Sequence, residues 1–221
     1  MVQKTGSLNV VALRVSALTE AGAPQVGGVA VTTKNVVTIG TALEIADGEE
    51  IEVFNADGDL CVSRKDRDKI KRATLSMSMC ELDFDLTALL CGGTLHTDGA
   101  ETIGYSIPKQ DDPEPLPVCF EAWTIAWDGD GQALDSSLNP RYHHWVFPFC
   151  RFRLDDTEFG SGAHEFAVEG TSIPNGLLTT SGPFNDWPSA IVGENVDAAV
   201  NDFLDINVPT IAGSDVVPVQ S

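Results

Sequence analysis

The chain of 221 residues is predicted to fold as a mainly β protein. Short runs of alternating or β-branched apolar residues recur along it, and Asp-Gly or Gly-Gly pairs separate several of them. Only one stretch has the residue spacing of a helix. A hydrophobic content of 43% and a mean hydropathy near zero are ordinary for a globular protein of this size, so one core of about 200 residues is expected.

The first predicted strands form a series separated by turns. Residues 36–45 are a β-branched run that is expected to end in a hairpin turn at 47–48, an Asp-Gly pair. Residues 51–53 alternate apolar with acidic side chains, as in a half-buried strand. A second Asp-Gly turn at 57–58 is expected to lead back through residues 60–62.

Residues 73–80 show the clearest alternation in the chain, with Ala73, Leu75, Met77 and Met79 on one face. They predict a strand with one buried side.

A single short helix is expected near 83–91. The aspartate that opens this range is a suitable N-cap, and the Gly-Gly pair at 92–93 is a stop signal. Leu86, Leu89 and Leu90 lie on one helical stripe, which is expected to pack against the sheet.

The second half is predicted to begin with a loop at 98–117, which is rich in Asp, Glu and Pro. Residues 118–127 read as a strand that is apolar on both faces, which implies burial on both sides, under a helix or against a neighbouring subunit. Residues 142–154 form another long strand, in which Pro148 indicates an edge or a bulge. A further strand is expected around 166–168.

The two ends differ from this central part. Residues 1–30 alternate at positions 11–15 and continue into a Gly/Pro-containing connector, and residues 205–221 show no periodicity. Both ends are interpreted as extended arms outside the compact core, which is assigned to residues 31–204. Such arms are either disordered or ordered by adding to the sheet edge of a partner.

The charge distribution is strongly asymmetric. Thirty-three acidic residues stand against thirteen basic ones, for a formal net charge of −20. A patch of basic charge in this background is a candidate for docking onto an acidic neighbour, although it can also be a solvated turn. Six of the thirteen basic residues fall in one short stretch, expected on a loop or at a strand end: Arg64, Lys65, Arg67, Lys69, Lys71 and Arg72.

No residue pattern in the chain indicates a metal site. The five cysteines are widely spaced and form no CxxC pair, and several of them sit inside apolar strand patterns, where a free Cys behaves as a small core residue. All five are interpreted as reduced and structural. Asp128–Gly131 is similar to the start of a calcium loop, but it lacks the later acidic ligands, so a tight turn is the better interpretation. His143 and His144 are adjacent in a predicted strand and therefore point to opposite faces.

Catalytic and targeting signals are equally scarce. No nucleophile elbow, phosphate-binding loop or dinucleotide fingerprint occurs, and no carboxylate pair is singled out for glycoside hydrolysis. Binding of nucleic acid is disfavoured because a chain with a net charge of −20 repels the phosphates. No membrane segment or signal peptide is evident, and synthesis in a cytoplasm is expected.

Several segments, taken in order, resemble the major tail protein of long-tailed phages that infect actinobacteria, the subunit of the tail tube. The most distinctive is the last, which runs from a Gly-Pro pair to Asp-Trp-Pro. The segments that carry the resemblance are 46–53, 80–83, 92–93, 104–108, 121–123, 142–148, 169–171 and 182–188.

This resemblance implies a tail-tube type of β-sandwich or barrel with one short flanking helix and extended terminal arms. In that family, six subunits join their sheets into a ring with a continuous inner barrel, and rings stack through loops and arms. The implied partners are further copies and other tail proteins such as the tape measure, terminator and distal tail proteins. No enzyme activity, cofactor or metal is implied, and the implied location is the virion, after assembly in the host cytoplasm.

The net charge suits such a conduit. Six copies of a −20 chain carry about −120 formal charges, which would keep DNA sliding through the lumen without specific binding. The basic cluster at 64–72 would then contact an acidic patch on the next subunit.

Other functions stay open at the level of sequence. A tail terminator or adaptor shares the fold. A β-sandwich that binds carbohydrate or protein would use exposed tryptophans as stacking platforms, with Trp123, Trp127 and Trp187 as candidates. A β-rich hydrolase with an acidic site is a further alternative.

Overall fold

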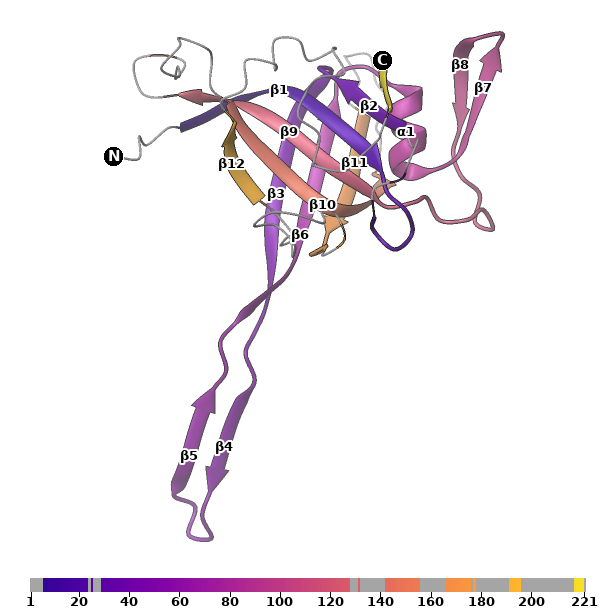
Figure 1. Ribbon diagram of the computed structural model, residues 1–221. Coiled ribbons are helices and arrows are strands. Elements are labelled where there is room, and N and C mark those ends of the chain that lie inside the picture. Colours follow the sequence, from indigo (N-terminus) through magenta and orange to yellow (C-terminus); the bar gives the residue numbers. More distant parts are fainter. Residues whose placement is uncertain are drawn as a thin grey trace, which may run out of the picture.

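The computed structural model describes residues 6–23, 25, 29–127, 131, 142–155, 166–175, 177, 191–195 and 217–220, with backbone alone at 6–8, 144, 191–195 and 217–220 (Figure 1). This part of the chain is mainly β, which confirms the predicted class. Its elements are β1 (Gly6–Ala17), β2 (Val29–Thr33), β3 (Val36–Ala46), β4 (Glu50–Phe54), β5 (Leu60–Lys65), β6 (Lys69–Met79), α1 (Phe84–Cys91), β7 (Thr94–Asp98), β8 (Glu101–Ser106), β9 (Val118–Trp127), β10 (Tyr142–Leu154), β11 (Phe166–Ser172), β12 (Ile191–Asn195) and β13 (Val217–Gln220).

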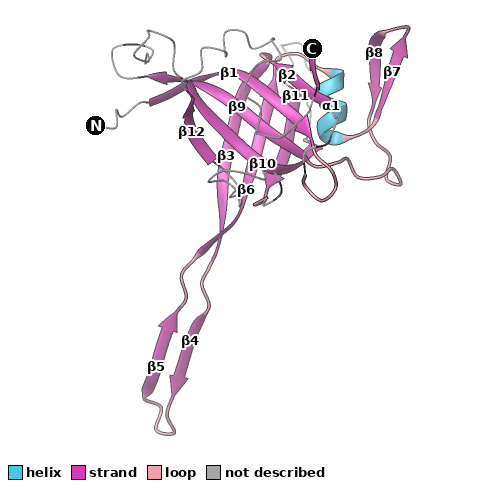
Figure 2. Cartoon of the chain, viewed as in Figure 1, coloured by secondary structure: helices cyan, strands magenta, loops and turns pink. Residues whose placement is uncertain are grey.

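Nine of the strands form one sheet. Its order is β13-β2-β1-β9-β10-β11-β6-β3, with β12 added beside β10. All these pairs are antiparallel except β13 with β2. The sheet curls so that β3 and β6 lie behind β1, β9 and β10, and α1 covers one end (Figures 1 and 2). Two hairpins, β4–β5 and β7–β8, stand apart from it.

The concave side of the sheet encloses the main core. Alternate residues of β1, β6, β9, β10 and β11 meet there together with the leucines of α1. Phe120 of β9 contacts Phe147 edge-on, with ring centroids 5.9 Å apart, and both side chains are fully buried. The predicted strands at 73–80, 118–127, 142–154 and 166–168 therefore exist, and the two-faced burial expected for 118–127 holds as far as Trp123.

The helix begins and ends where its signals predict. The Asp83 side chain accepts a hydrogen bond of 2.9 Å from the backbone N–H of Leu86, which satisfies one free donor of the first turn. Gly92 ends the helix with φ at +73°, in a region that favours glycine. Leu86 and Leu90 are buried in the main core, which confirms the predicted packing of the leucine stripe.

Pro148 marks a bulge, one of the two alternatives that the sequence left open. The β9–β10 register shifts between Phe147 and Cys150, and β10 changes neighbours there. Residues 142–146 pair with both β9 and β12, whereas residues 150–154 pair with β11. The strand is therefore central, and the missing N–H of the proline falls where no ladder bond is needed.

The expectation that residues 1–30 lie outside the core is wrong. β1 lies between β2 and β9, and Ala12, Leu13 and Val15 are completely buried. The charge of Arg14 makes this segment look exposed in the sequence, but the guanidinium is paired within the protein.

The C-terminal arm, expected at 205–221, is described only at β13. This strand adds to the edge of the chain's own sheet, parallel to β2. The remaining residues of 205–221 lie outside the described part of the chain.

Part of one expected loop is in fact a strand. Residues 101–106, expected in a loop, form β8 and pair with β7. One face of this hairpin approaches α1, where the Tyr105 hydroxyl donates a hydrogen bond of 2.8 Å to the Gly92 carbonyl. A hairpin covered on one face needs few apolar residues, so its sequence looks like that of a loop. The rest of the segment, 107–117, is a loop as predicted.

The hairpin turn expected at 47–48 is also wrong. The chain continues from β3 into β4, and it reverses at 55–59, around the second Asp-Gly pair, as predicted. A Cβ on Gly48 would lie 1.8 Å from the carbonyl oxygen of Asp66 on the facing strand. This glycine therefore permits a close approach of two backbones within the ribbon.

Candidate functional site

The most unusual feature of the molecule is a long hairpin, residues 43–72. It begins where β3 and β6 leave the sheet, continues through β4 and β5, and projects away from the body (Figures 1 and 2). From 46 to 55 it reaches about 30 Å, at about 3.3 Å per residue. Among the described residues, β4 and β5 pair only with each other.

The six basic residues proposed for subunit contact all lie on this long hairpin. Arg64 and Lys65 end β5, Arg67 is in the connection, and Lys69 begins β6. This position at strand ends agrees with the sequence prediction. The two remaining members, Lys71 and Arg72, lie further along β6, near the body.

Half of this cluster is paired within the hairpin itself. Arg64 contacts Asp66 at 2.9 Å, and Glu44 accepts hydrogen bonds from both Arg72 and Lys71. These bonds, that from Arg72 first, lower the pKa of the Glu44 carboxyl below its ordinary value. The hairpin also carries nine acidic residues between 44 and 72, so its net charge is −3.

Three cations remain available on the hairpin. Lys65, Arg67 and Lys69 are exposed, and within the described parts of the chain none of them forms an ion pair. The patch for contact is therefore smaller than the sequence suggested, and it lies midway along the hairpin.

The outer half of the long hairpin has an apolar face. In the β4–β5 register Ile51 lies opposite Arg64 and Val53 opposite Val62, whereas Glu50 and Lys65 share the other face. The half-buried strand expected at 51–53 is wrong, because no second layer covers it here. Eight of the seventeen exposed large apolar side chains of the described residues lie on this hairpin: Leu43, Ile45, Ile51, Val53, Phe54, Leu60, Val62 and Ile70.

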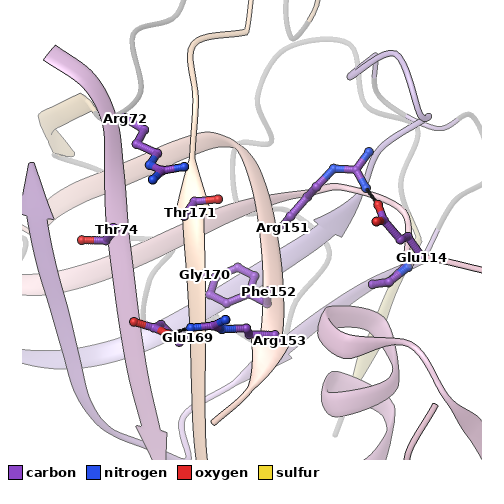
Figure 3. Close-up of a pocket in the computed structure, with 10 residues that line it drawn as sticks. Arg72, Thr74, Glu114, Arg151, Phe152, Arg153, Glu169, Gly170 and Thr171 are labelled. Atoms are coloured by element: carbon purple, nitrogen blue, oxygen red, sulfur yellow. Dashed lines mark hydrogen bonds and ion pairs between the residues drawn. The ribbon is translucent and has the colours of Figure 1, made fainter. Parts of the chain in front are cut away.

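A separate concavity of about 580 Å³ opens on the outer side of β6, β10 and β11 (Figure 3). Figure 3 shows Arg153 beside Glu169, at 2.5 Å, and Arg151 turned toward Glu114, at 2.8 Å. Arg72, which also lines it, is held by Glu44. Each arginine has its own carboxylate partner, so the concavity offers ion pairs rather than a free acid and base or an excess of positive charge.

The other residues considered for chemistry are placed as follows. Within the described ranges, no group of three or more metal-binding side chains is found, and Asp128, Gly129 and Asp130 lie outside these ranges. His143 and His144 occupy consecutive positions of β10. The side chain of His144 lies outside the described part of the chain, so the opposite orientation of the two rings stays a prediction. Cys91, Cys119 and Cys150 are buried thiols, whereas Cys61 and Cys80 are exposed, so the core position expected for several of the cysteines holds for three of the five.

The tryptophans proposed as stacking platforms differ in exposure. Trp123 is fully buried and cannot serve as a platform. Trp127 is 39% exposed at the end of β9, and Trp187 lies outside the described residues.

Sequence reasoning missed one buried ion pair. Arg14 of β1 lies opposite Glu121 of β9 and donates two hydrogen bonds of 2.7 Å to its carboxylate, while its guanidinium also lies 5.4 Å from the Trp123 ring. Burial acts to lower the pKa of Arg14, but the charge and hydrogen bonds of Glu121 outweigh it and raise that pKa. The sequence did contain a signal for a buried arginine. Leu13 and Val15 alternate as residues of a core strand, and Arg14 lies between them in that strand.

In the part of the chain that the structure describes, α1 is the sole helix, and with eight residues it is too short to cross a membrane. Comparison with models of protein families and with curated proteins finds no match to this chain.

Proposed function

We propose that this chain is a self-assembling structural subunit of a phage tail tube. Copies join side by side into rings, and the rings stack into a conduit for DNA. The single observation that carries this proposal is the uncovered apolar face of the long hairpin. The resemblance of segments within residues 46–188 to tail tube subunits is the reason for proposing stacked rings as the form of the assembly.

An isolated two-stranded hairpin is marginal in water, and this one holds Ile51, Val53 and Val62 on one side, where no other described residue buries them. Each of these side chains is between 44% and 52% exposed. Full burial of a large aliphatic side chain stabilises a protein by about 1.5–3 kcal/mol relative to exposure. Covering the whole face in an assembly would therefore contribute several kcal/mol to association, which favours an interface over a free surface.

A second feature supports joining of sheets. β3 is an edge strand of 11 residues, and within the described residues its only ladder partner is β6. It contains neither proline nor lysine, the residues that commonly protect an edge from pairing. Addition of a strand from another copy at this edge would extend the sheet around a ring.

The charge supports the role in conducting DNA. A chain of net charge −20 cannot neutralise phosphates over a broad face, so the tube would repel rather than hold the nucleic acid. The location in the virion, and contacts with the tape measure, terminator and distal tail proteins, are parts of the same proposal.

Negative-stain microscopy and size-exclusion chromatography of the purified full-length chain test the proposal. Rings and tubes are expected for the natural sequence. Val53→Asp combined with Val62→Asp is expected to leave monomers with an unchanged thermal midpoint, because both residues are exposed on the hairpin. Ser63→Asp is the matched control, since it adds a charge to the opposite face of the same strand.

Each outcome has a distinct meaning. A natural chain that stays monomeric at all concentrations would rule out the proposal. Single rings that never stack would favour a tail terminator or adaptor over a tube subunit. Loss of assembly in Ser63→Asp as well as in the double variant would show that added charge, rather than the apolar face, is responsible.

A further inference from the structure

The end of the molecule opposite the long hairpin has complementary properties. Figure 1 shows β7–β8 projecting from the body on the side away from β4–β5. We define the acidic end as residues 94–116, which comprise this second hairpin and the loop that follows it. It carries five acidic residues and one lysine, for a net charge of −4.

Most of these carboxylates are uncompensated. Of the five, only Glu114 forms an ion pair within the described residues, with Arg151. The other four are exposed and form none there: Asp98, Glu101, Asp111 and Asp112. On the long hairpin, the cations that are likewise exposed and form no ion pair within the described residues are Lys65, Arg67 and Lys69.

Apolar side chains accompany the acidic ones. Ile103 is 62% exposed, Ile107 68% and Leu116 46%, all within the acidic end. The long hairpin carries its apolar face on one side and Lys65 on the other, so both of its faces are available to a partner that surrounds the ribbon. Its net charge is −3, and the local patch of Lys65, Arg67 and Lys69 is the part that is opposite in sign to the acidic end. Both surfaces therefore offer apolar area, and this local patch offers the complementary charge.

From these observations we infer that the acidic end of one copy receives the long hairpin of a second copy. The inference rests on the proposed self-assembly and names the surface that the hairpin contacts. Because the two surfaces lie at opposite ends of one chain, the contact is heterologous. Each bound copy still presents a free hairpin at one end and a free acidic end at the other, so the contact can repeat along an axis.

Cross-linking from a natural cysteine tests this placement. Cys61 is exposed on β5, and a Cys80→Ser background removes the other exposed thiol. A cysteine is introduced by Gln110→Cys, in the acidic end, or by Ala21→Cys, at an exposed turn elsewhere. After treatment of assembled protein with a short bismaleimide, Gln110→Cys is expected to give at least tenfold more cross-linked dimer than Ala21→Cys.

Charge reversal supplies an independent test. Lys65→Glu with Arg67→Glu, or Glu101→Lys with Asp111→Lys, is expected to raise the concentration for half-assembly at least tenfold. All four changes together are expected to restore it to within threefold of the natural chain. The residues are exposed, and circular dichroism melting identifies any variant that has not folded.

Failure of this inference is distinguishable from failure of the proposed function. If the natural chain forms tubes but Gln110→Cys and Ala21→Cys cross-link equally, the acidic end is not the receiving surface. A combined reversal that assembles no better than either pair alone would overturn it as well. If the natural chain does not assemble, self-assembly itself is wrong and this inference falls with it.

Discussion

The body of the molecule and its long hairpin are built from the same kind of sequence but differ in burial. β9 in the body buries both faces as far as Trp123, whereas β4 and β5 are exposed at every position. All three segments contain β-branched or aromatic residues suited to strands. The difference teaches that alternation predicts a strand, while burial depends on whether another layer lies against it.

Charges show the same contrast. In the body, Arg14 and Glu121 are 5% and 1% exposed at their side chains, and each satisfies the other with two hydrogen bonds. On the hairpin, Arg64 pairs with Asp66 while its side chain is 73% exposed. When one partner of a buried ion pair is removed, water cannot reach the remaining charge to stabilise it. When one partner of an exposed ion pair is removed, water takes its place.

The largest expected difference between the two regions is in thiol reactivity. Cys61, on the hairpin, is exposed, whereas burial raises the pKa of the Cys119 thiol in the body far above its ordinary value. Burial likewise raises the pKa of Cys91 and of Cys150 to about 12. Because the thiolate is the reacting species, Cys119 in the monomer is expected to react with Ellman's reagent at least about 100-fold more slowly than Cys61.

The measurement is a count of thiols against time at pH 8. Two of the five, Cys61 and Cys80, are expected to react rapidly in native protein, and all five in urea. Cys61→Ser should remove one rapid equivalent. A third rapid thiol in the folded chain would show that the body opens more readily than its burial indicates.

Stability is expected to separate the regions next. Arg14→Met removes the two hydrogen bonds that the guanidinium donates to the buried carboxylate of Glu121 and is expected to lower the free energy of unfolding by about 3–5 kcal/mol. Arg64→Met on the hairpin should change it by no more than about 1 kcal/mol. Urea denaturation measures both.

Arg14→Met combined with Glu121→Leu is the control for the first variant. Removing both charges is expected to recover most of the loss, because no unpaired ion remains in the core. Equal losses in the single and double variants would mean that packing, rather than the unpaired carboxylate, sets the effect.

The smallest expected effect is a pH dependence at the base of the hairpin. Hydrogen bonds from Arg72 and Lys71 lower the pKa of Glu44 below its ordinary 4.5. A lowered folded-state pKa stabilises the paired form above pH 4.5, and this contribution is lost as the pH falls through the folded-state value. Carboxyl NMR should record a pKa below 4.5, and Arg72→Gln should move it back toward 4.5. An unchanged midpoint in that variant would assign the shift to another cause.

Much of the local structure was predictable because its causes are local. The helix at 84–91 follows from an N-cap aspartate and a glycine pair, and the part of β6 from residue 73 to 79 follows from its alternation. The missing N–H of Pro148 predicted either an edge strand or a bulge, and the structure has the bulge. The expected position at strand ends or in a loop holds for Arg64, Lys65, Arg67 and Lys69, whereas Lys71 and Arg72 lie within β6.

The candidate site was only partly predictable. The six basic residues were identified, but the sequence could not show that Glu44 lies against Lys71 and Arg72, since these residues are 27 and 28 positions away. Nor could it show that the apolar residues of 51–62 are uncovered. Pairing across strands is decided by register, which depends on the whole sheet.

The sequence by itself determined the mainly β class, the single helix of the described residues, most strand positions and the charge of −20. These depend on propensity, periodicity and composition, which are properties of neighbouring residues. Only the tertiary structure decided that β1 lies in the core with Arg14 neutralised, and that residues 43–72 stand away from it. The physical reason is that burial is a relation between distant segments, so the same alternating pattern can end inside a sheet or on an unsupported hairpin.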